Sequence, residues 1–258
     1  MITISQDKCI HCGACGAVCP THHICPGPEG PVINKRLSCL QCMHCSAVCP
    51  GQAIHFASVP AYEEYPYMPE DEILRLIMTR RSVRHFKPEA PEKEDITWAL
   101  DMAQWAPSGK NRHPNQWLVV YGKEKCDAVY HLIVDTCEKQ QMLPQLVAQR
   151  KKGNHDSVTC GCSTIIFSLM PDDRFGELTG DADGIIATAT AELLLHHMGI
   201  GTCWGGYITF LANKMPELKQ ALHIPEKMHV ACTLLCGISD EIYHNIPWRD
   251  HAKIQWVE

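Results

Sequence analysis

A cysteine motif that is repeated within the first 50 residues constrains the fold of this chain more than any other feature. The run Cys9-Ile-His-Cys12-Gly-Ala-Cys15-Gly-Ala-Val-Cys19-Pro20 returns 30 residues later as Cys39-Leu-Gln-Cys42-Met-His-Cys45-Ser-Ala-Val-Cys49-Pro50. The spacing of the cysteines, the Ala-Val pair and the final proline all match. Self-similarity of this kind predicts two copies of one small supersecondary unit.

The spacing C-x2-C-x2-C-x3-C-P is typical of two-cluster iron–sulfur proteins, in which the fourth cysteine of each run binds the other cluster. Three cysteines on a tight loop can reach three corners of one cube, and a distant part of the chain supplies the fourth ligand. Residues 1–57 therefore resemble a bacterial-type dicluster ferredoxin. The predicted ligands are Cys9, Cys12, Cys15 and Cys49 for one 4Fe-4S cluster, and Cys39, Cys42, Cys45 and Cys19 for the second.

A structural zinc site is the alternative for this segment. One zinc ion needs only two C-x2-C pairs, so it would leave four cysteines at matching repeat positions unexplained. Cys25 has no place in the repeat. We expect it to be a plain buried thiol, because free cysteine behaves as a small hydrophobic residue.

The overall composition favours a redox protein of a reducing compartment. The chain has 258 residues and 16 cysteines, and no apolar signal-peptide core stands at its N-terminus, which predicts free thiols and a cytoplasmic location. The net charge of -6 disfavours nucleic-acid binding, since phosphate contacts need an excess of Lys and Arg. No apolar run approaches the roughly 18 residues that would span a membrane.

The composition changes sharply after Phe56, and three prolines fall within residues 60–69. Such a stretch suits an extended linker. We therefore expect a ferredoxin-like domain over 1–57, a linker over 58–69 and a second domain over 70–258.

Apolar periodicity predicts interleaved helices and strands in this second domain. Residues 70–80, 91–105 and 182–198 follow a helical pattern, whereas 117–121, 165–169, 229–235 and 254–257 are short apolar runs typical of strands. The helix over 182–198 has little polarity on any face, so it needs packing partners all round. Neither a dinucleotide-binding G-x-G-x-x-G in the right context nor a P-loop is present.

Three further motifs stand in this segment. They are Arg80-Arg81-Ser82-Val83-Arg84, Pro107-Ser108-Gly109-Lys110-Asn111 and Gly199-Ile-Gly201-Thr-Cys203-Trp204-Gly205-Gly206. Taken singly, they also fit cations at a helix C-terminus, a turn, and a helix cap followed by a loop. Taken together and in this order, they resemble the nitroreductase family of FMN oxidoreductases over about residues 70–258.

The resemblance implies an α+β fold: an FMN-binding α/β domain with a central mixed sheet flanked by helices, beside the small ferredoxin-like domain. It implies cofactor contacts from Arg80 and Ser82 at the FMN phosphate and ribityl chain, with Arg81 in the same motif, and from Arg84 near the pyrimidine edge. It implies that Pro107, Ser108 and Asn111 belong to a loop that reaches the flavin of the second subunit. Cys203, Trp204, Gly205 and Gly206 would lie beside the isoalloxazine, with the Gly205 backbone N–H near N5. Arg249 would be a basic residue at the FMN phosphate.

The sequence departs from the family pattern at Asn245, at His113 and at Cys160-Gly-Cys162-Ser163. We expect Cys160 and Cys162 to be small packing residues, because C-x-C spacing strains a disulfide. The run 137–154 is a candidate substrate lid, but its glutamines and basic residues are more typical of a solvated helix face.

The resemblance implies a homodimeric enzyme that passes electrons from NAD(P)H, or from a redox protein through the clusters, to FMN and then to a small electron-poor organic acceptor such as a nitroaromatic or a quinone. The flavin carries this chemistry, so no catalytic side chain is required. A pure electron carrier or redox sensor, and a specialised relative such as a reductive dehalogenase or a flavin-cleaving enzyme, are the alternatives.

Overall fold

The computed structural model describes residues 2–40, 42–57, 72–109, 112–153, 156–173 and 181–258. The chain forms two compact units, one from Met1–Thr79 together with Ile242–Glu258 and the other from Arg80–Glu241. This division differs from the expected one at residues 72–79 and 242–258, which group with the first unit. The expected linker over 58–69 lies outside the described residues. Within the described ranges, none of the helices is long and apolar enough to cross a membrane.

The first unit repeats one pattern twice, as the cysteine motif predicts. Two one-turn helices, α1 (Ala14–Ala17) and α2 (His44–Ala47), each carry the third cysteine of a run. Each helix follows a residue in the left-handed conformation, Gly13 at φ 77° and Met43 at φ 60°. This conformation is easy for glycine and unfavourable for methionine, so the second loop keeps the shape of the first in spite of the strain.

Two small sheets frame these loops. Strand β1 (Ile2–Ile4) pairs antiparallel with β4 (Ile54–Phe56), and β2 (Ile24–Gly27) pairs with β3 (Gly30–Ile33). Ile2, Ile24, Ile54 and Phe56 form the apolar core between them, together with buried cysteines. Helix α3 (Glu72–Thr79), expected over 70–80, also belongs to this unit.

The C-terminal tail is anchored on the second cysteine loop. The backbone N–H groups of His244 and Asn245 donate to Ala47 O at 2.8 and 3.1 Å, and Trp248 packs against the core of the first unit. The strand expected over 254–257 is wrong. These residues form neither strand nor helix, and Trp256 is 79% exposed. An apolar run becomes a strand only where a neighbouring strand offers an edge, and periodicity cannot show whether one does.

The second unit is built on a four-stranded sheet in the order β5-β6-β8-β7. Three of its strands match expected ones: β5 (Gln116–Tyr121), β6 (Thr164–Pro171) and β8 (Met228–Ile238). The fourth, β7 (Ile200–Trp204), lies in the glycine-rich run, where no strand was predicted. All neighbours pair antiparallel, and a parallel bridge joins Ser82 to Thr202 at the β7 edge.

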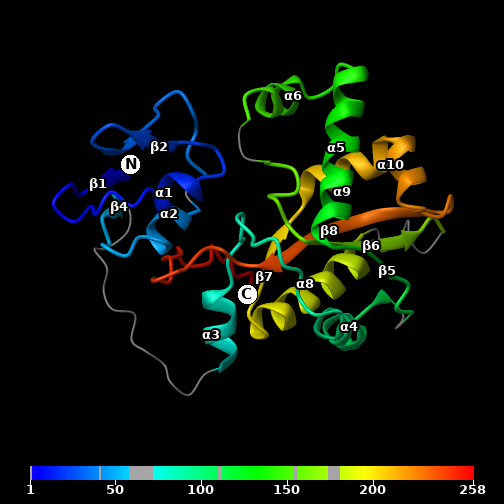
Figure 1. Ribbon diagram of the computed structural model, residues 1–258. Helices are drawn as coiled ribbons and strands as arrows, with labels where there is room; N and C mark the ends of the chain where they lie inside the picture. The colour runs from blue at the N-terminus through cyan, green and yellow to red at the C-terminus, as the bar shows by residue number, and fades with distance from the viewer. Residues whose placement is uncertain (1, 41, 58–71, 110–111, 154–155, 174–180) are drawn as a thin grey trace. The chain divides into compact units, whose positions relative to one another are not determined.

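Helices cover both faces of this sheet (Figure 1). Helices α4 (Lys93–Met102) and α8 (Ala182–His197), with the 3-10 turn η1 (Ala103–Trp105), share one core with Ile166 and Leu234. Helices α5 (Lys123–Lys139), α6 (Pro144–Lys151), α9 (Gly206–Lys214) and α10 (Pro216–Ala221) lie on the other face, whose core includes Ile165, Phe167 and Leu235. Successive strand residues thus alternate between the two cores.

Candidate functional site

The cysteines of the first unit form two groups that cross between the two loops. Burial, together with the nearby thiols of Cys49, Cys12 and Cys9, raises the pKa of Cys15 to about 11. Cys49 therefore lies beside the first loop, although it belongs to the second run of the sequence. The Ala53 backbone N–H donates to Cys49 Sγ at 3.2 Å. N–H···S bonds of this kind tune the potential of a bound cluster.

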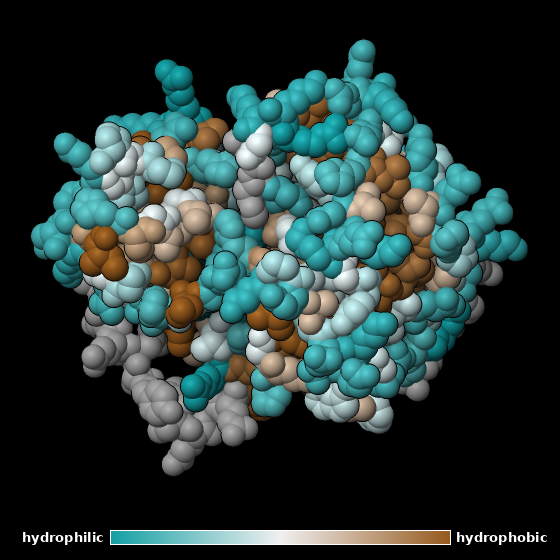
Figure 2. Space-filling view, in the orientation of Figure 1, coloured by the Kyte–Doolittle hydropathy of each residue, from teal (hydrophilic) through white to brown (hydrophobic). Residues whose placement is uncertain are grey.

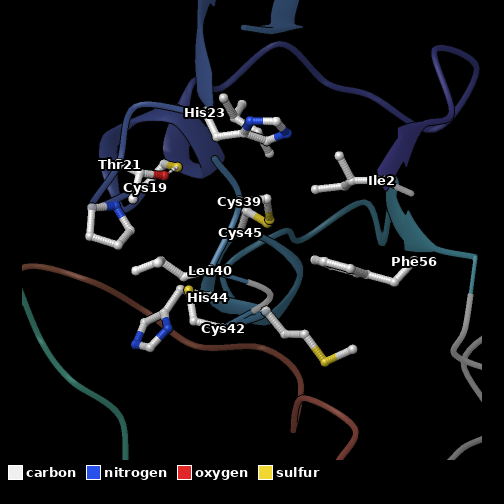
Figure 3. Close-up of a pocket in the computed structure, with 13 residues that line it drawn as sticks. Ile2, Cys19, Thr21, His23, Cys39, Leu40, Cys42, His44, Cys45 and Phe56 are labelled. Carbon is white, nitrogen blue, oxygen red and sulfur yellow. Dashed lines mark hydrogen bonds between the residues drawn. The ribbon is translucent and has the colours of Figure 1, made fainter. Parts of the chain in front are cut away.

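The second group surrounds a pocket. Burial raises the pKa of Cys45, and the thiols of Cys42 and Cys19 add to the effect. Figure 3 shows this pocket, which is lined by four thiols and by apolar side chains; the lining includes Cys19, Cys39, Cys42, Cys45, Ile2, Ile24, Leu40 and Phe56. A pocket lined by four cysteine sulfurs and apolar side chains has the chemistry that an iron–sulfur cube needs. Cys25 belongs to neither group; it lies on β2, and its thiol donates to Val32 O.

No three His, Cys, Asp or Glu side chains within the described ranges are arranged to hold one metal ion. The ligands of a four-iron cluster surround a larger object, and their sulfur atoms lie farther apart than those around a single ion.

In the second unit, a buried carboxylate joins two of the predicted motifs. Glu192 on α8 accepts hydrogen bonds from Arg80 Nη1 at 3.1 Å, Thr202 Oγ1 at 3.3 Å and Trp204 Nε1 at 3.0 Å. Its side chain is 6% exposed, and that of Arg80 is 31% exposed. The sequence analysis did not single out Glu192. The available signal was an acidic residue within an otherwise apolar helix.

The arginine motif runs along the edge of β7. The Val83 backbone N–H donates to Thr202 O at 2.8 Å, and Gly201 leaves room for Val83, since a Cβ atom at Gly201 would lie 3.0 Å from its side chain. Arg84 Nη1 donates to Ser82 O at 3.1 Å. Arg81 is buried and donates to Arg80 O. Segments that are about 120 residues apart in the sequence therefore form one site.

The loop over 107–113 is tied to the first turn of α8. The Gly109 N–H donates to Asp183 Oδ1 at 2.8 Å, and the Ser108 hydroxyl accepts from the His113 N–H at 2.9 Å. Pro107 precedes these contacts, and Asn111 lies outside the described residues. Asp183 is a second buried acid that sequence reasoning missed.

At the start of α9, two neighbouring backbone N–H groups differ in whether they are available to a ligand. The Gly205 N–H, expected near the flavin, donates to Thr233 O at 2.8 Å and is thus already engaged. Gly206 opens the helix, and the first N–H groups of a helix have no acceptor within it. A Cβ atom at Gly206 would meet nothing within 4 Å. The open space and the free helix terminus fit a flat, electron-rich ring next to Gly206.

The structure also describes the surroundings of Arg249 and of most of the candidate lid. Arg249 lies in the first unit, where its Nη1 donates to Trp248 O at 2.9 Å and is 3.8 Å from Met43 Sδ. Its contact with a phosphate remains a prediction. In the candidate lid, Arg150 of α6 pairs with Asp135 and Glu138 on the surface, as a solvated helix face would. Asn154 lies outside the described residues.

Comparison with known proteins places this architecture in a family. The nitroreductase family model matches residues 77–238, and the chain belongs to the nitroreductase family. A 4Fe-4S binding domain model matches residues 2–22. The chain is therefore an oxidoreductase of this family with an N-terminal iron–sulfur domain, as expected.

Several relatives are similar over the second unit. A protein of Archaeoglobus fulgidus, provisionally described as an NADH dehydrogenase/NAD(P)H nitroreductase, is 28% identical over 65% of this chain and 85% of its own length. A Desulfitobacterium hafniense nitroreductase structure with bound FMN is 25% identical over 73% of this chain and 99% of that chain, with a TM-score of 0.59. An FMN-bound Bacteroides fragilis nitroreductase, 20% identical over 73% of this chain and 100% of that chain, has a TM-score of 0.58.

Proposed function

We propose that this protein is an FMN- and iron–sulfur-dependent oxidoreductase of the cytoplasm. It transfers electrons between a reduced nicotinamide or a ferredoxin-type donor, two 4Fe-4S clusters, FMN and an electron-poor organic acceptor such as a nitroaromatic or a quinone. The observation that carries the proposal is the meeting of the arginine motif with β7 and the start of α9 around Glu192. Relatives of this fold contain FMN, and bound FMN would supply the two-electron chemistry here.

Each side chain of the site has a proposed binding role. Glu192 fixes Arg80 through one of the five guanidinium N–H donors, which leaves others for the FMN phosphate, with Ser82 beside it. Arg84 supplies positive charge at the pyrimidine edge, where charge favours a reduced, anionic ring. The Gly206 N–H takes the role first expected of Gly205, because the Gly205 group is engaged with Thr233.

Absorption spectra test the proposal directly. We expect anaerobically purified protein to show flavin and iron–sulfur absorption, and NADH, NADPH or reduced ferredoxin, added in turn, to bleach the flavin. Turnover of a nitroaromatic or a quinone would then separate an enzyme from an electron carrier. Anaerobically purified protein that shows no flavin absorption would contradict the proposal.

Arg80→Ala should weaken FMN binding by about tenfold to a hundredfold. The change removes a charge-assisted hydrogen bond to phosphate, which costs about 1.5–3 kcal/mol. Flavin content after extensive dialysis measures the effect. Arg112→Ala is the matched control, because Arg112 pairs with Asp173 on the surface and should leave FMN binding unchanged. Equal flavin content in the wild type, Arg80→Ala and Arg112→Ala would argue against a contact between Arg80 and the FMN phosphate.

Cys19→Ala should remove the cluster assigned to Cys39, Cys42 and Cys45, although Cys19 belongs to the other run of the sequence. Iron should fall from about eight to about four per chain, because each cluster contains four irons. Cys25→Ala, which changes a thiol outside both groups, should retain all of the iron. Electron paramagnetic resonance of the reduced proteins identifies which cluster is lost. Loss of the cluster on Cys9, Cys12 and Cys15 would contradict the crossed ligation.

We also propose a homodimer with two equivalent FMN sites. Ile185 and Ile186 on α8 remain 41% and 39% exposed, and Trp98 and Trp105 are exposed on the neighbouring α4 and η1. On the face drawn in Figure 2, apolar side chains reach the surface in separate patches. Patches of this kind often mark interfaces.

Ile186→Glu should dissociate the dimer and release FMN, because it places a charge in an interface that must exclude water. Light scattering at low micromolar concentration gives the oligomeric state, and flavin fluorescence in the filtrate gives the FMN loss. A wild-type monomer that retains FMN would refute the shared site.

A further inference from the structure

One side chain of the C-terminal tail holds the segment that carries Cys49. The amide of the half-buried Asn245 donates from Nδ2 to Cys49 O at 3.4 Å and accepts at Oδ1 from Gln52 Nε2 at 3.3 Å. The Asn245 backbone N–H donates to Ala47 O at 3.1 Å. A carbonyl oxygen can only accept, so the bond to Cys49 fixes which way the Asn245 amide points. One residue of the tail therefore contacts the segment over 47–52 at three points.

The tail is anchored to the first unit on both sides of Asn245. On one side, Tyr243 packs edge-on against His44 of α2, with 6.2 Å between the ring centroids and 77° between the ring planes. On the other side, Pro247 is buried and Trp248 packs against the apolar core. These anchors place the Asn245 side chain, so its two amide bonds need not hold the tail by themselves.

The segment that Asn245 holds directs a backbone donor at the Cys49 sulfur. Cys49 O also accepts from the Gln52 N–H at 3.1 Å, which closes a tight turn. Gln52 has φ 51°, a left-handed conformation that is unfavourable for a residue other than glycine, so a bond from outside helps to keep the turn closed. Ala53 follows directly, and its N–H donates to Cys49 Sγ at 3.2 Å. The closed turn thus places this N–H on the sulfur.

The same turn in the first copy of the repeat has different contacts. The His22 N–H donates to Cys19 O at 3.1 Å, as the Gln52 N–H does to Cys49 O, and His22 has the same φ of 51°. The sulfur of Cys19 contacts the Thr21 hydroxyl, at 3.8 Å. The tail therefore adds its amide to the copy of the turn that directs a backbone N–H at the cysteine sulfur.

We propose that Asn245 is a positioning residue that sets the reduction potential of the first cluster, the one assigned to Cys49 and the first loop. The presence of that cluster rests on the function proposed above, whereas the position of Cys49 rests on the contacts of Asn245. A hydrogen bond to a cluster sulfur favours the reduced state, which carries one more electron. Asn245 keeps the turn closed and so keeps the Ala53 N–H on the Cys49 sulfur.

An anaerobic redox titration of the holoprotein, followed by electron paramagnetic resonance, tests this role. In Asn245→Ala, the reduction equilibrium of the first cluster should shift about threefold to tenfold toward the oxidised state, because the N–H···S bond weakens. A tenfold shift corresponds to about 59 mV for a one-electron couple. The second cluster should keep its potential. Cys19→Ala, which is expected to retain only the first cluster, provides the reference signal of that cluster.

His244→Ala is the matched control in the tail. The His244 side chain is exposed, and its bond to Ala47 O uses the backbone N–H, which the substitution leaves in place. Both potentials should therefore equal those of the wild type. Loss of the first cluster alone from Asn245→Ala, with all iron retained in His244→Ala, would support the same role. An unchanged first potential in Asn245→Ala, an equal shift of both clusters, or the same shift in His244→Ala would overturn the proposal.

Iron and sulfide analysis separates a failure of this proposal from a failure of the proposed function. Wild-type protein that is purified anaerobically without iron and sulfide would reject the clusters and the function built on them. Wild-type protein with about eight irons per chain, together with an unshifted potential in Asn245→Ala, would reject the role of Asn245 alone.

Discussion

Removal of the clusters should unfold the first unit and free the C-terminal tail, while residues 80–241 remain folded. Among its described residues, the first unit has only two-stranded sheets and a small apolar core, and a lone two-stranded sheet is marginally stable at best. Burial and the neighbouring thiols raise the pKa of Cys15, so the cluster-free cysteines form no ion pairs that could replace the bonds to iron. Bound structural metal supplies on the order of 10 kcal/mol in such small domains. The fold of this unit should therefore depend on iron.

Limited proteolysis with mass spectrometry measures this effect. After oxidation and chelation of the iron, we expect cleavage throughout 2–57 and also within 242–258, because the tail is anchored on Ala47 through His244 and Asn245. The second unit has its own two cores and should resist the protease. Untreated holoprotein is the control. Protease resistance of 2–57 in iron-free protein would show that the apolar core alone is sufficient.

Glu192→Ala should lower the free energy of unfolding of the second unit by about 2–4 kcal/mol and abolish stable FMN binding. The indole N–H of the half-buried Trp204 and the hydroxyl of the buried Thr202 would lose their acceptor, and an unsatisfied buried donor costs about 1–3 kcal/mol. Arg80 is partly exposed, so solvent screens its share of the loss. Arg80 would also lose the contact that orients it toward phosphate.

Thermal unfolding followed by circular dichroism should show a decrease of roughly 5–15 °C in the Tm, given the usual 2–4 °C per kcal/mol for a domain of this size. Glu192→Gln retains an acceptor oxygen and should lose less. Glu217→Ala, at an exposed acid that accepts one surface hydrogen bond, is the matched control and should shift the Tm by about a degree. An unchanged Tm and full flavin retention in Glu192→Ala would show that the three hydrogen bonds are dispensable.

Local patterns in the sequence were sufficient for much of the fold. The repeat spacing predicted two similar loops, and the structure brings Cys49 to the first loop and Cys19 to the second, although their role as cluster ligands remains a prediction. Apolar runs located β5, β6 and β8, and helical periodicity located α4 and α8 to within a few residues. Each of these signals depends on neighbours within about 15 residues, and such neighbours are visible in a sequence.

Tertiary structure decided the features that depend on distant partners. The run over 200–204 is a strand because β8 offers it an edge, whereas the run over 254–257 has no such edge and is not one. The Gly205 N–H donates to Thr233 O on β8, and Glu192 joins Arg80 to Trp204 across 112 and 12 residues. A hydrogen bond needs its partner within about 3 Å, and only the folded chain determines which distant groups come that close.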